Sequence, residues 1–79
     1  MPTNEPALII NAPVLVPSVK HQTILAAFDA LPSGHAALLI NDHDPKPLLY
    51  QLEAEYPGIF SVHYEESGPT RHAIRVTKN

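Results

Sequence analysis

The chain has 79 residues, no cysteine and a formal net charge of -3. That length allows one small domain, and the absence of cysteine excludes disulfides, thiolate metal sites and cysteine nucleophiles. Five Lys and Arg residues without a basic cluster argue against nucleic-acid binding. The first residues, MPTNEP, do not look like a signal peptide, and no apolar run approaches the ~20 residues of a membrane span. We therefore expect a cytoplasmic protein.

The first half of the chain predicts a strand and a helix. Residues 1–6 are predicted to be a loose leader, and residues 7–79 a single domain. Residues 7–10, ALII, form a continuous apolar run that is typical of a buried strand. Ser18 is a suitable N-cap for a helix that ends at residue 31. Its apolar residues recur at helical spacing: Ile24, Leu25, Phe28 and Leu31. His21 lies on the same stripe, so we expect it to point toward the core.

The second half predicts a strand, a helix and a hairpin. Residues 36–40, AALLI, fit a strand that is covered on both faces. Asp44 is a natural N-cap for a second helix, with Pro45 in its first position. This helix has its own apolar stripe: Leu48, Leu49, Leu52 and Tyr56. Residues 59–65 and 72–77 alternate between apolar and polar, which indicates an antiparallel hairpin with Phe60, Val62 and Tyr64 on one face.

The resulting order is β-α-β-α-β-β. Parallel strands joined by helices need those helices packed on the sheet. We therefore predict an α/β two-layer sandwich, with two helices on a four-stranded mixed sheet. A partly exposed apolar face on such a small sheet would suit a homodimer or a docking surface.

The loop NDHDPKPL, between the second strand and the second helix, concentrates the polar chemistry. Ligands of open α/β sheets bind beyond the carboxyl ends of the parallel strands, and this edge brings His21 near the loop. His21, Asp42 and His43 are a candidate metal set, for a divalent transition metal such as Zn, Fe, Mn or Ni. The alternative is turn and capping chemistry without a metal, in which Asp42 caps the turn and Asp44 caps the helix.

The same edge is a candidate ligand or partner site beyond any metal. It comprises His21 and the loop residues Asn41, Asp42, His43, Asp44 and Lys46. Lys46, in the first turn of the second helix, is a candidate anion contact together with the free amides there. The neighbouring carboxylates oppose this role.

The segment NDHDPKPL followed by YQLEAEYPG, with VPSVKHQTILAAFDAL upstream, resembles the domain of unknown function 2249 family over residues 7–77. The resemblance implies a fold similar to the sulfur carriers of the TusA/SirA type. Those carriers use a Cys-Pro motif where this chain has Val16-Pro17, so persulfide chemistry does not carry over. The closing strand also lacks a tryptophan that is typical of the family. Related domains accompany hemerythrin-like and cupin-like metal domains, which implies a metal or redox partner.

Three functional hypotheses follow. The first is a non-enzymatic accessory domain that binds a metal, or a metal or redox protein, through the edge built from residues 18–21, which include His21, and residues 41–46. The second is an interaction or dimerisation module without a ligand, using the sheet face or the hairpin edge. The third and weakest is an enzyme with His43 and Asp42 as an acid/base pair.

Overall fold

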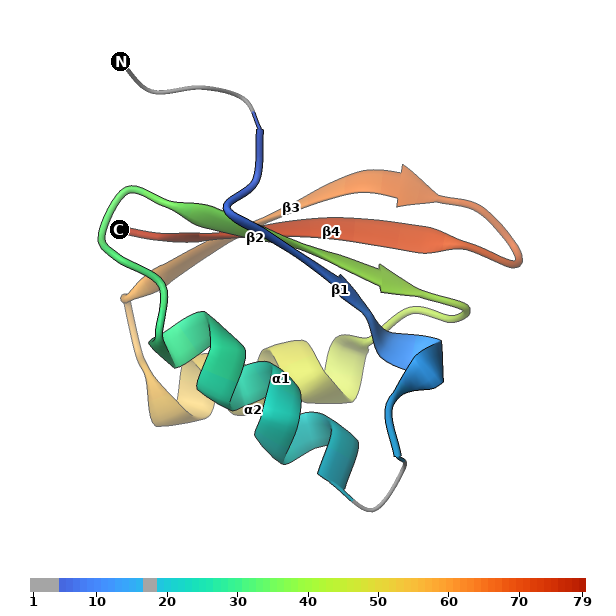
Figure 1. Cartoon of the computed structure of the whole chain (residues 1–79), viewed down its shortest axis with the longest axis horizontal. Coiled ribbons are helices and arrows are strands. Elements are labelled where there is room, and N and C mark those ends of the chain that lie inside the picture. Colours follow the sequence, from blue (N-terminus) through green and yellow to red (C-terminus); the bar gives the residue numbers. More distant parts are fainter. Residues whose placement is uncertain (1–4, 17–18) are drawn as a thin grey trace.

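The structure is a computed structural model that describes residues 5–16 and 19–79. Residues 1–4 of the predicted leader, and Ser18 with its predicted capping role, lie outside these ranges. The elements are β1 (Leu8–Asn11), the 3-10 turn η1 (Ala12–Val14), α1 (Lys20–Asp29), β2 (Ala36–Asn41), α2 (Lys46–Glu55), β3 (Phe60–Ser67) and β4 (His72–Lys78). Apart from the short η1 turn, this is the predicted order (Figure 1).

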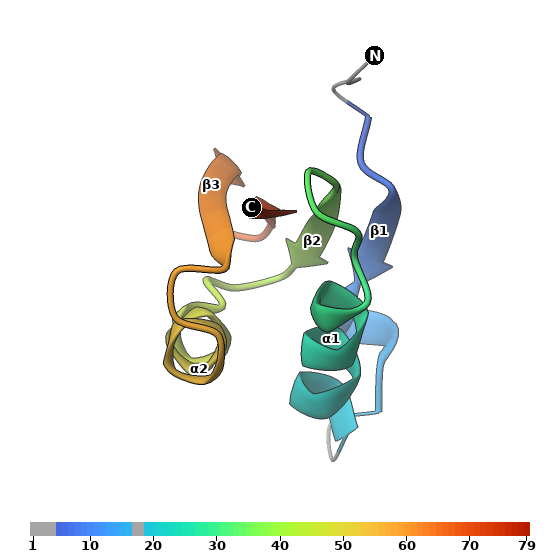
Figure 2. The same cartoon turned by 90° about the vertical axis from the view of Figure 1, so that its left-hand side faces the viewer.

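The four strands form one mixed sheet in the order β1-β2-β4-β3. β1 and β2 are parallel, whereas β4 runs antiparallel to both of its neighbours. Both helices lie on the same face of the sheet, as two views at right angles show (Figures 1 and 2). The predicted two-layer sandwich with a four-stranded mixed sheet is therefore confirmed. In the described part of the chain, neither helix is long and apolar enough to cross a bilayer.

The core lies between the helices and the sheet. The largest fully buried side chains come from both helices and from the helix-facing side of β2 and β4: Phe28, Ile24, Leu39, Leu52, Ile74 and Val76. Phe60 of β3 closes one end, with its ring 6.2 Å from Phe28 and edge-on to Tyr56 at 5.7 Å. The residues of the two predicted helical stripes thus meet across a single core.

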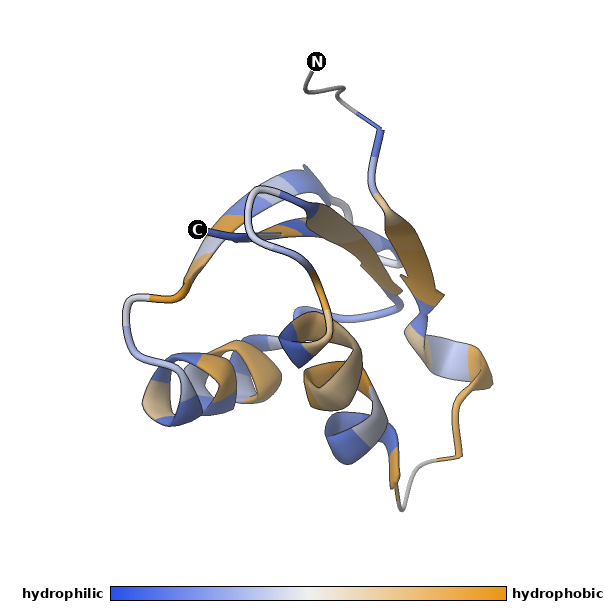
Figure 3. Cartoon of the chain, turned by 60° about the vertical axis from the view of Figure 1, so that its left-hand side comes forward, coloured by the Kyte–Doolittle hydropathy of each residue, from blue (hydrophilic) through white to orange (hydrophobic). Residues whose placement is uncertain are grey.

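The opposite face of the sheet is open, and two predictions of burial are wrong there. β1 is an edge strand that pairs only with β2, and its Ile9 is 63% exposed. In β2 the residues alternate, so that Leu38 and Ile40 are only half-buried. Because both helices cover the same face, the apolar runs of β1 and β2 keep one side uncovered. Figure 3 shows this concentration of apolar residues on β1 and β2.

The hairpin forms as predicted, but the predicted half-burial of β3 is wrong beyond Phe60: β3 is an edge strand, and Val62 and Tyr64 are 42% and 36% exposed. Val62 and Tyr64 of β3 are in register with the buried Val76 and Ile74 of β4. A bulge follows Tyr64, and the register resumes at Glu66. β3 is the second edge strand of the sheet, and its Tyr64 contacts Asp44 in the loop that precedes α2.

Candidate functional site

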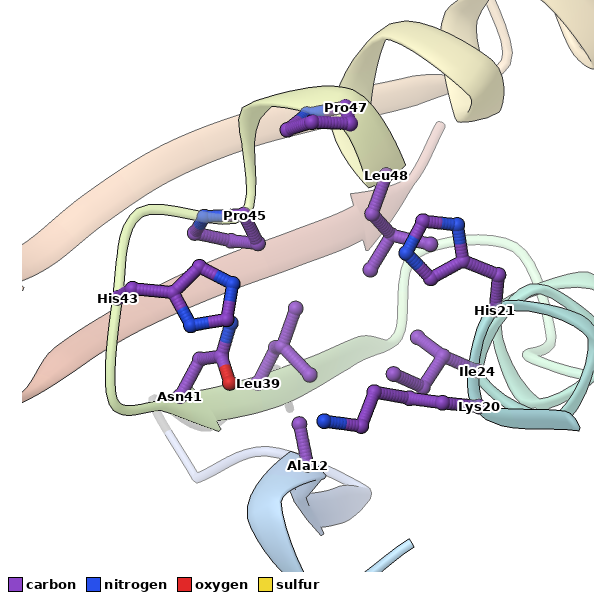
Figure 4. A pocket seen from close by; sticks show the side chains of 10 residues that line it. All are labelled: Ala12, Lys20, His21, Ile24, Leu39, Asn41, His43, Pro45, Pro47 and Leu48. Carbon is purple, nitrogen blue, oxygen red and sulfur yellow. The ribbon is translucent and has the colours of Figure 1, made fainter. Parts of the chain in front are cut away.

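A pocket of about 130 Å³ lies beyond the carboxyl ends of β1 and β2, between the first turns of α1 and α2. Its apolar lining comprises Ala12, Ile24, Leu39 and Leu48, with Pro45 and Pro47. Its polar lining comprises Lys20, His21, Asn41 and His43. Figure 4 shows His21 and His43 on opposite sides of the pocket. The sequence placed the candidate site at this edge, and the structure brings His21, Asn41 and His43 together there.

The helix starts position the rim of the pocket. α1 begins at Lys20, so Lys20 and His21 both occupy its first turn. His21 is exposed rather than directed into the core, and its Nδ1 makes a long contact of 3.4 Å with Oε1 of Gln51 on α2. Ile24, one turn further along α1, reaches the apolar side of the pocket. The apolar stripe of α1 therefore lines the pocket at the start of the helix and packs in the core further along it.

Asn41 is the most deeply buried polar side chain of the pocket. It closes β2 on the helix-facing side and is only 5% exposed. Its Oδ1 has no hydrogen-bond partner in the described part of the chain. Figure 4 shows its side chain directed into the pocket. His72, its register partner on β4, likewise has a buried Nδ1 without a partner. Buried polar atoms in folded proteins are nearly always hydrogen-bonded, so this acceptor calls for an explanation.

The acid/base pair considered in the sequence is formed, but in solvent. Nδ1 of His43 donates to Oδ1 of Asp42 at 2.7 Å, and the two side chains are 69% and 64% exposed. This hydrogen bond is the largest cause of the lowered pKa of the Asp42 carboxyl, and the charge of Lys20 contributes less. His43 lines the pocket and Asp42 does not. The pair therefore lies at the rim, where solvent screens it.

Asp44 does not cap α2, contrary to the prediction. The helix begins one residue later than expected, at Lys46, with Pro45 as its N-cap. The Asp44 carboxylate instead accepts a 2.5 Å hydrogen bond from the hydroxyl of Tyr64 on β3. Burial, followed by this hydrogen bond, raises the pKa of Tyr64 to about 12. Asp44 thus ties the loop to the edge of the sheet, while Lys46 is exposed and does not line the pocket.

The sequence comparisons identify the family. A family model described as "Uncharacterized conserved protein (DUF2249)" matches residues 9–78. The chain belongs to this family. No curated protein and no solved structure matches it. The matched segment contains every described residue of the pocket, but the family description assigns no activity to it.

In this DUF2249 domain the predicted metal set is not assembled. No group of three or more His, Asp or Glu side chains is arranged to hold a metal ion among residues 5–16 and 19–79. His21 and His43 face each other across the pocket, but Asp42 bonds to His43 and lies outside the lining. The structure also places Lys20 in the lining of the pocket. The predicted edge contained Lys20 within residues 18–21, but no role of its own was predicted for it.

Proposed function

We propose that this DUF2249 domain is a small non-enzymatic binding domain that holds a small polar molecule in the pocket between the first turns of α1 and α2. The observation that carries this proposal is the buried Oδ1 of Asn41, which has no hydrogen-bond partner within the described part of the chain. A buried acceptor without a donor costs about 1–3 kcal/mol. A bound molecule that donates to Oδ1 offsets this cost, and the domain then stabilises its ligand through the same bond.

The composition and place of the pocket support the proposal. Small-molecule sites are mostly apolar, with a few polar groups that fix orientation, and this pocket combines apolar residues such as Leu39 and Leu48 with the polar Asn41 and Lys20. Open α/β sheets bind ligands beyond the carboxyl ends of parallel strands, and the pocket follows β1 and β2. Its volume of about 130 Å³ is close to the roughly 150 Å³ of an engineered cavity that binds benzene, a ligand of about six non-hydrogen atoms. A ligand of only a few non-hydrogen atoms is therefore expected.

Metal binding is a weaker form of the same proposal. His21 and His43 supply two nitrogen ligands, whereas catalytic zinc sites use three protein ligands and structural sites four. A third ligand from this chain requires Asp42 to leave its hydrogen bond with His43. Docking of a hemerythrin-like or cupin-like partner would use the same rim, because both imidazoles are exposed there.

The test is an amide-resolved NMR titration of the whole chain with a library of small polar molecules, and separately with Zn²⁺. Binders are expected to shift amides of residues 20–24 and 41–48. Asn41→Leu removes the acceptor and should abolish these shifts. The matched control is Asn11→Leu, since Asn11 is exposed at the end of β1 and should leave binding intact. Silence across the whole library, or shifts that survive Asn41→Leu unchanged, would contradict the proposal. Selective shifts with stoichiometric Zn²⁺ alone would favour the metal form.

A second candidate function is self-association through the open face of the sheet. β1 is a free edge, and next to it Ile9, Leu38 and Ile40 expose apolar surface. Free strand edges pair readily with another chain, and the occupant proposed here is a second copy of this chain. Light scattering after size exclusion should give a dimer that Ile9→Lys disrupts. A monomer at millimolar concentration would rule this candidate out.

A further inference from the structure

The pocket is lined by basic side chains and by no acidic ones among the described residues. The titratable side chains that line it are Lys20, His21 and His43, and no carboxylate lines it within the described part of the chain. Lys20 contributes an ammonium group, which Figure 4 shows directed into the pocket. The two imidazoles add positive charge when they are protonated. This lining favours a negatively charged ligand, although the whole chain has a net charge of -3.

Both helices reinforce this preference. α1 and α2 each have ten residues, and the first turn of each lines the pocket. The N-terminal ends of helices carry partial positive charge and free amides. Pro45 and Pro47 have no N–H to donate, so α1, which also carries Lys20, contributes the stronger donors. A bound anion is therefore expected to lie on the α1 side of the pocket.

The neighbouring acids are occupied elsewhere. Asp42 accepts from His43 and is exposed to solvent, and Asp44 accepts from Tyr64 on the opposite side of the loop. The charge of Lys20 reaches Asp42, because it contributes to the lowered pKa of that carboxyl after the His43 hydrogen bond. The exposed Asp42 thus partly offsets the positive potential of the pocket, although its side chain lies outside the pocket lining.

Asn41 adds a second requirement. In the orientation that the structure gives this amide, the buried atom is Oδ1, which accepts hydrogen bonds and does not donate to an anion. We propose that the ligand is a small monoanion with a hydrogen-bond donor beside its charge, such as a short hydroxycarboxylate. Its carboxylate meets Lys20 and the start of α1, its hydroxyl donates to Oδ1 of Asn41, and its alkyl group lies on Leu39 and Leu48. This inference rests on the proposed binding function.

The experiment compares three probes of nearly the same shape by calorimetric or NMR titration of the whole chain. Lactate carries both groups, lactamide lacks the charge, and propionate lacks the hydroxyl. Lactate is expected to bind with a Kd on the order of 1 mM, as suits a ligand of this size. Lactamide and propionate should each bind about tenfold or more weakly, because each loses a hydrogen bond to a charged or buried group.

Variants of two lysines locate the charge. Lys20→Met should remove the preference for lactate over lactamide. Lys46→Met is the matched control, since Lys46 lies in the first turn of α2 but outside the pocket, and it should leave the preference unchanged. Equal binding of lactate and lactamide would show that the ligand need not be an anion. Equal binding of lactate and propionate would show that it needs no hydrogen-bond donor. Silence of all three probes overturns the inference of a hydroxycarboxylate ligand. Each of these three results leaves the proposed pocket function standing as long as other members of the library bind. Silence of every molecule overturns both.

Discussion

Replacing Asn41 by leucine should stabilise the ligand-free domain while abolishing binding. Leucine has nearly the same branched shape as asparagine, so the strand end and the pocket wall keep their form. Its methyl groups lie in an apolar lining that includes Leu39 and Leu48, and they need no hydrogen bond. The substitution thus separates the two roles of this position: a cost to folding and a contact for the ligand.

The size of the effect follows from the burial of Asn41. Its side chain is 5% exposed, and its Oδ1 has no hydrogen-bond partner among residues 5–16 and 19–79. Removal of such an orphan acceptor should return about 1–3 kcal/mol to the free energy of unfolding. For a domain of this size each kcal/mol corresponds to about 4–8 °C in Tm. Asn41→Leu is therefore expected to melt at least about 4 °C above the wild-type chain.

The assay is urea unfolding at neutral pH, followed by circular dichroism, with a thermal melt of the same samples. Asn11→Leu makes the same chemical change at an exposed position, where it should shift the free energy of unfolding by no more than about 0.5 kcal/mol. A wild-type chain that is as stable as Asn41→Leu, or more stable, refutes the reasoning. Oδ1 would then have a structural partner, and His72 on the neighbouring strand would be the first to examine.

Three further predictions concern the hairpin, the rim and the core. The pKa of Tyr64 is raised to about 12, so its contribution to stability is present below the ordinary value of 10.0 and is lost as the pH rises toward 12. Asp44→Asn should lower this pKa, as measured by ultraviolet titration. An unchanged pKa would contradict the hydrogen bond from Tyr64 to Asp44. The pKa of Asp42 lies below its ordinary 3.8, so its small contribution to stability is present above that value and is lost as the pH falls through the lowered pKa. His43→Ala should raise this pKa, as measured by NMR titration of the carboxyl group. The absence of a rise would exclude the hydrogen bond between His43 and Asp42. Phe28 is fully buried, and Phe28→Ala should cost about 3–5 kcal/mol of the roughly 5–15 that a domain has; a loss below about 1 kcal/mol in urea unfolding would show that the core is placed wrongly.

The sequence predicted the order of the elements because periodicity is a local property. The stripes through Phe28 and Leu52 and the hairpin of residues 60–78 are present in the structure, with the ends of the elements shifted by no more than two residues. The exposure of the strands was not predicted. A continuous apolar run such as residues 7–10 looks the same in an edge strand as in a central one. Only the arrangement of the whole sheet exposes Ile9.

The site was predicted in place but not in composition. The carboxyl ends of parallel strands meet at one edge, so His21 and His43 could be brought together from the topology alone. Asp44 shows the limit of local sequence signals. It was predicted to cap the second helix, but its carboxylate instead accepts a hydrogen bond from Tyr64, twenty residues away. Asn41 looked like a loop residue, since nothing in the sequence shows that the last residue of β2 faces the helices.

The most direct test of the pocket is an NMR measurement of intermolecular NOEs from the methyl group of bound lactate. If lactate binds in the pocket, NOEs are expected to the side chains of Leu39 and Leu48, which line it. These signals should disappear with Asn41→Leu. NOEs to Ile9 and Leu38 would instead place the ligand on the open face of the sheet and would rule out the proposed binding site.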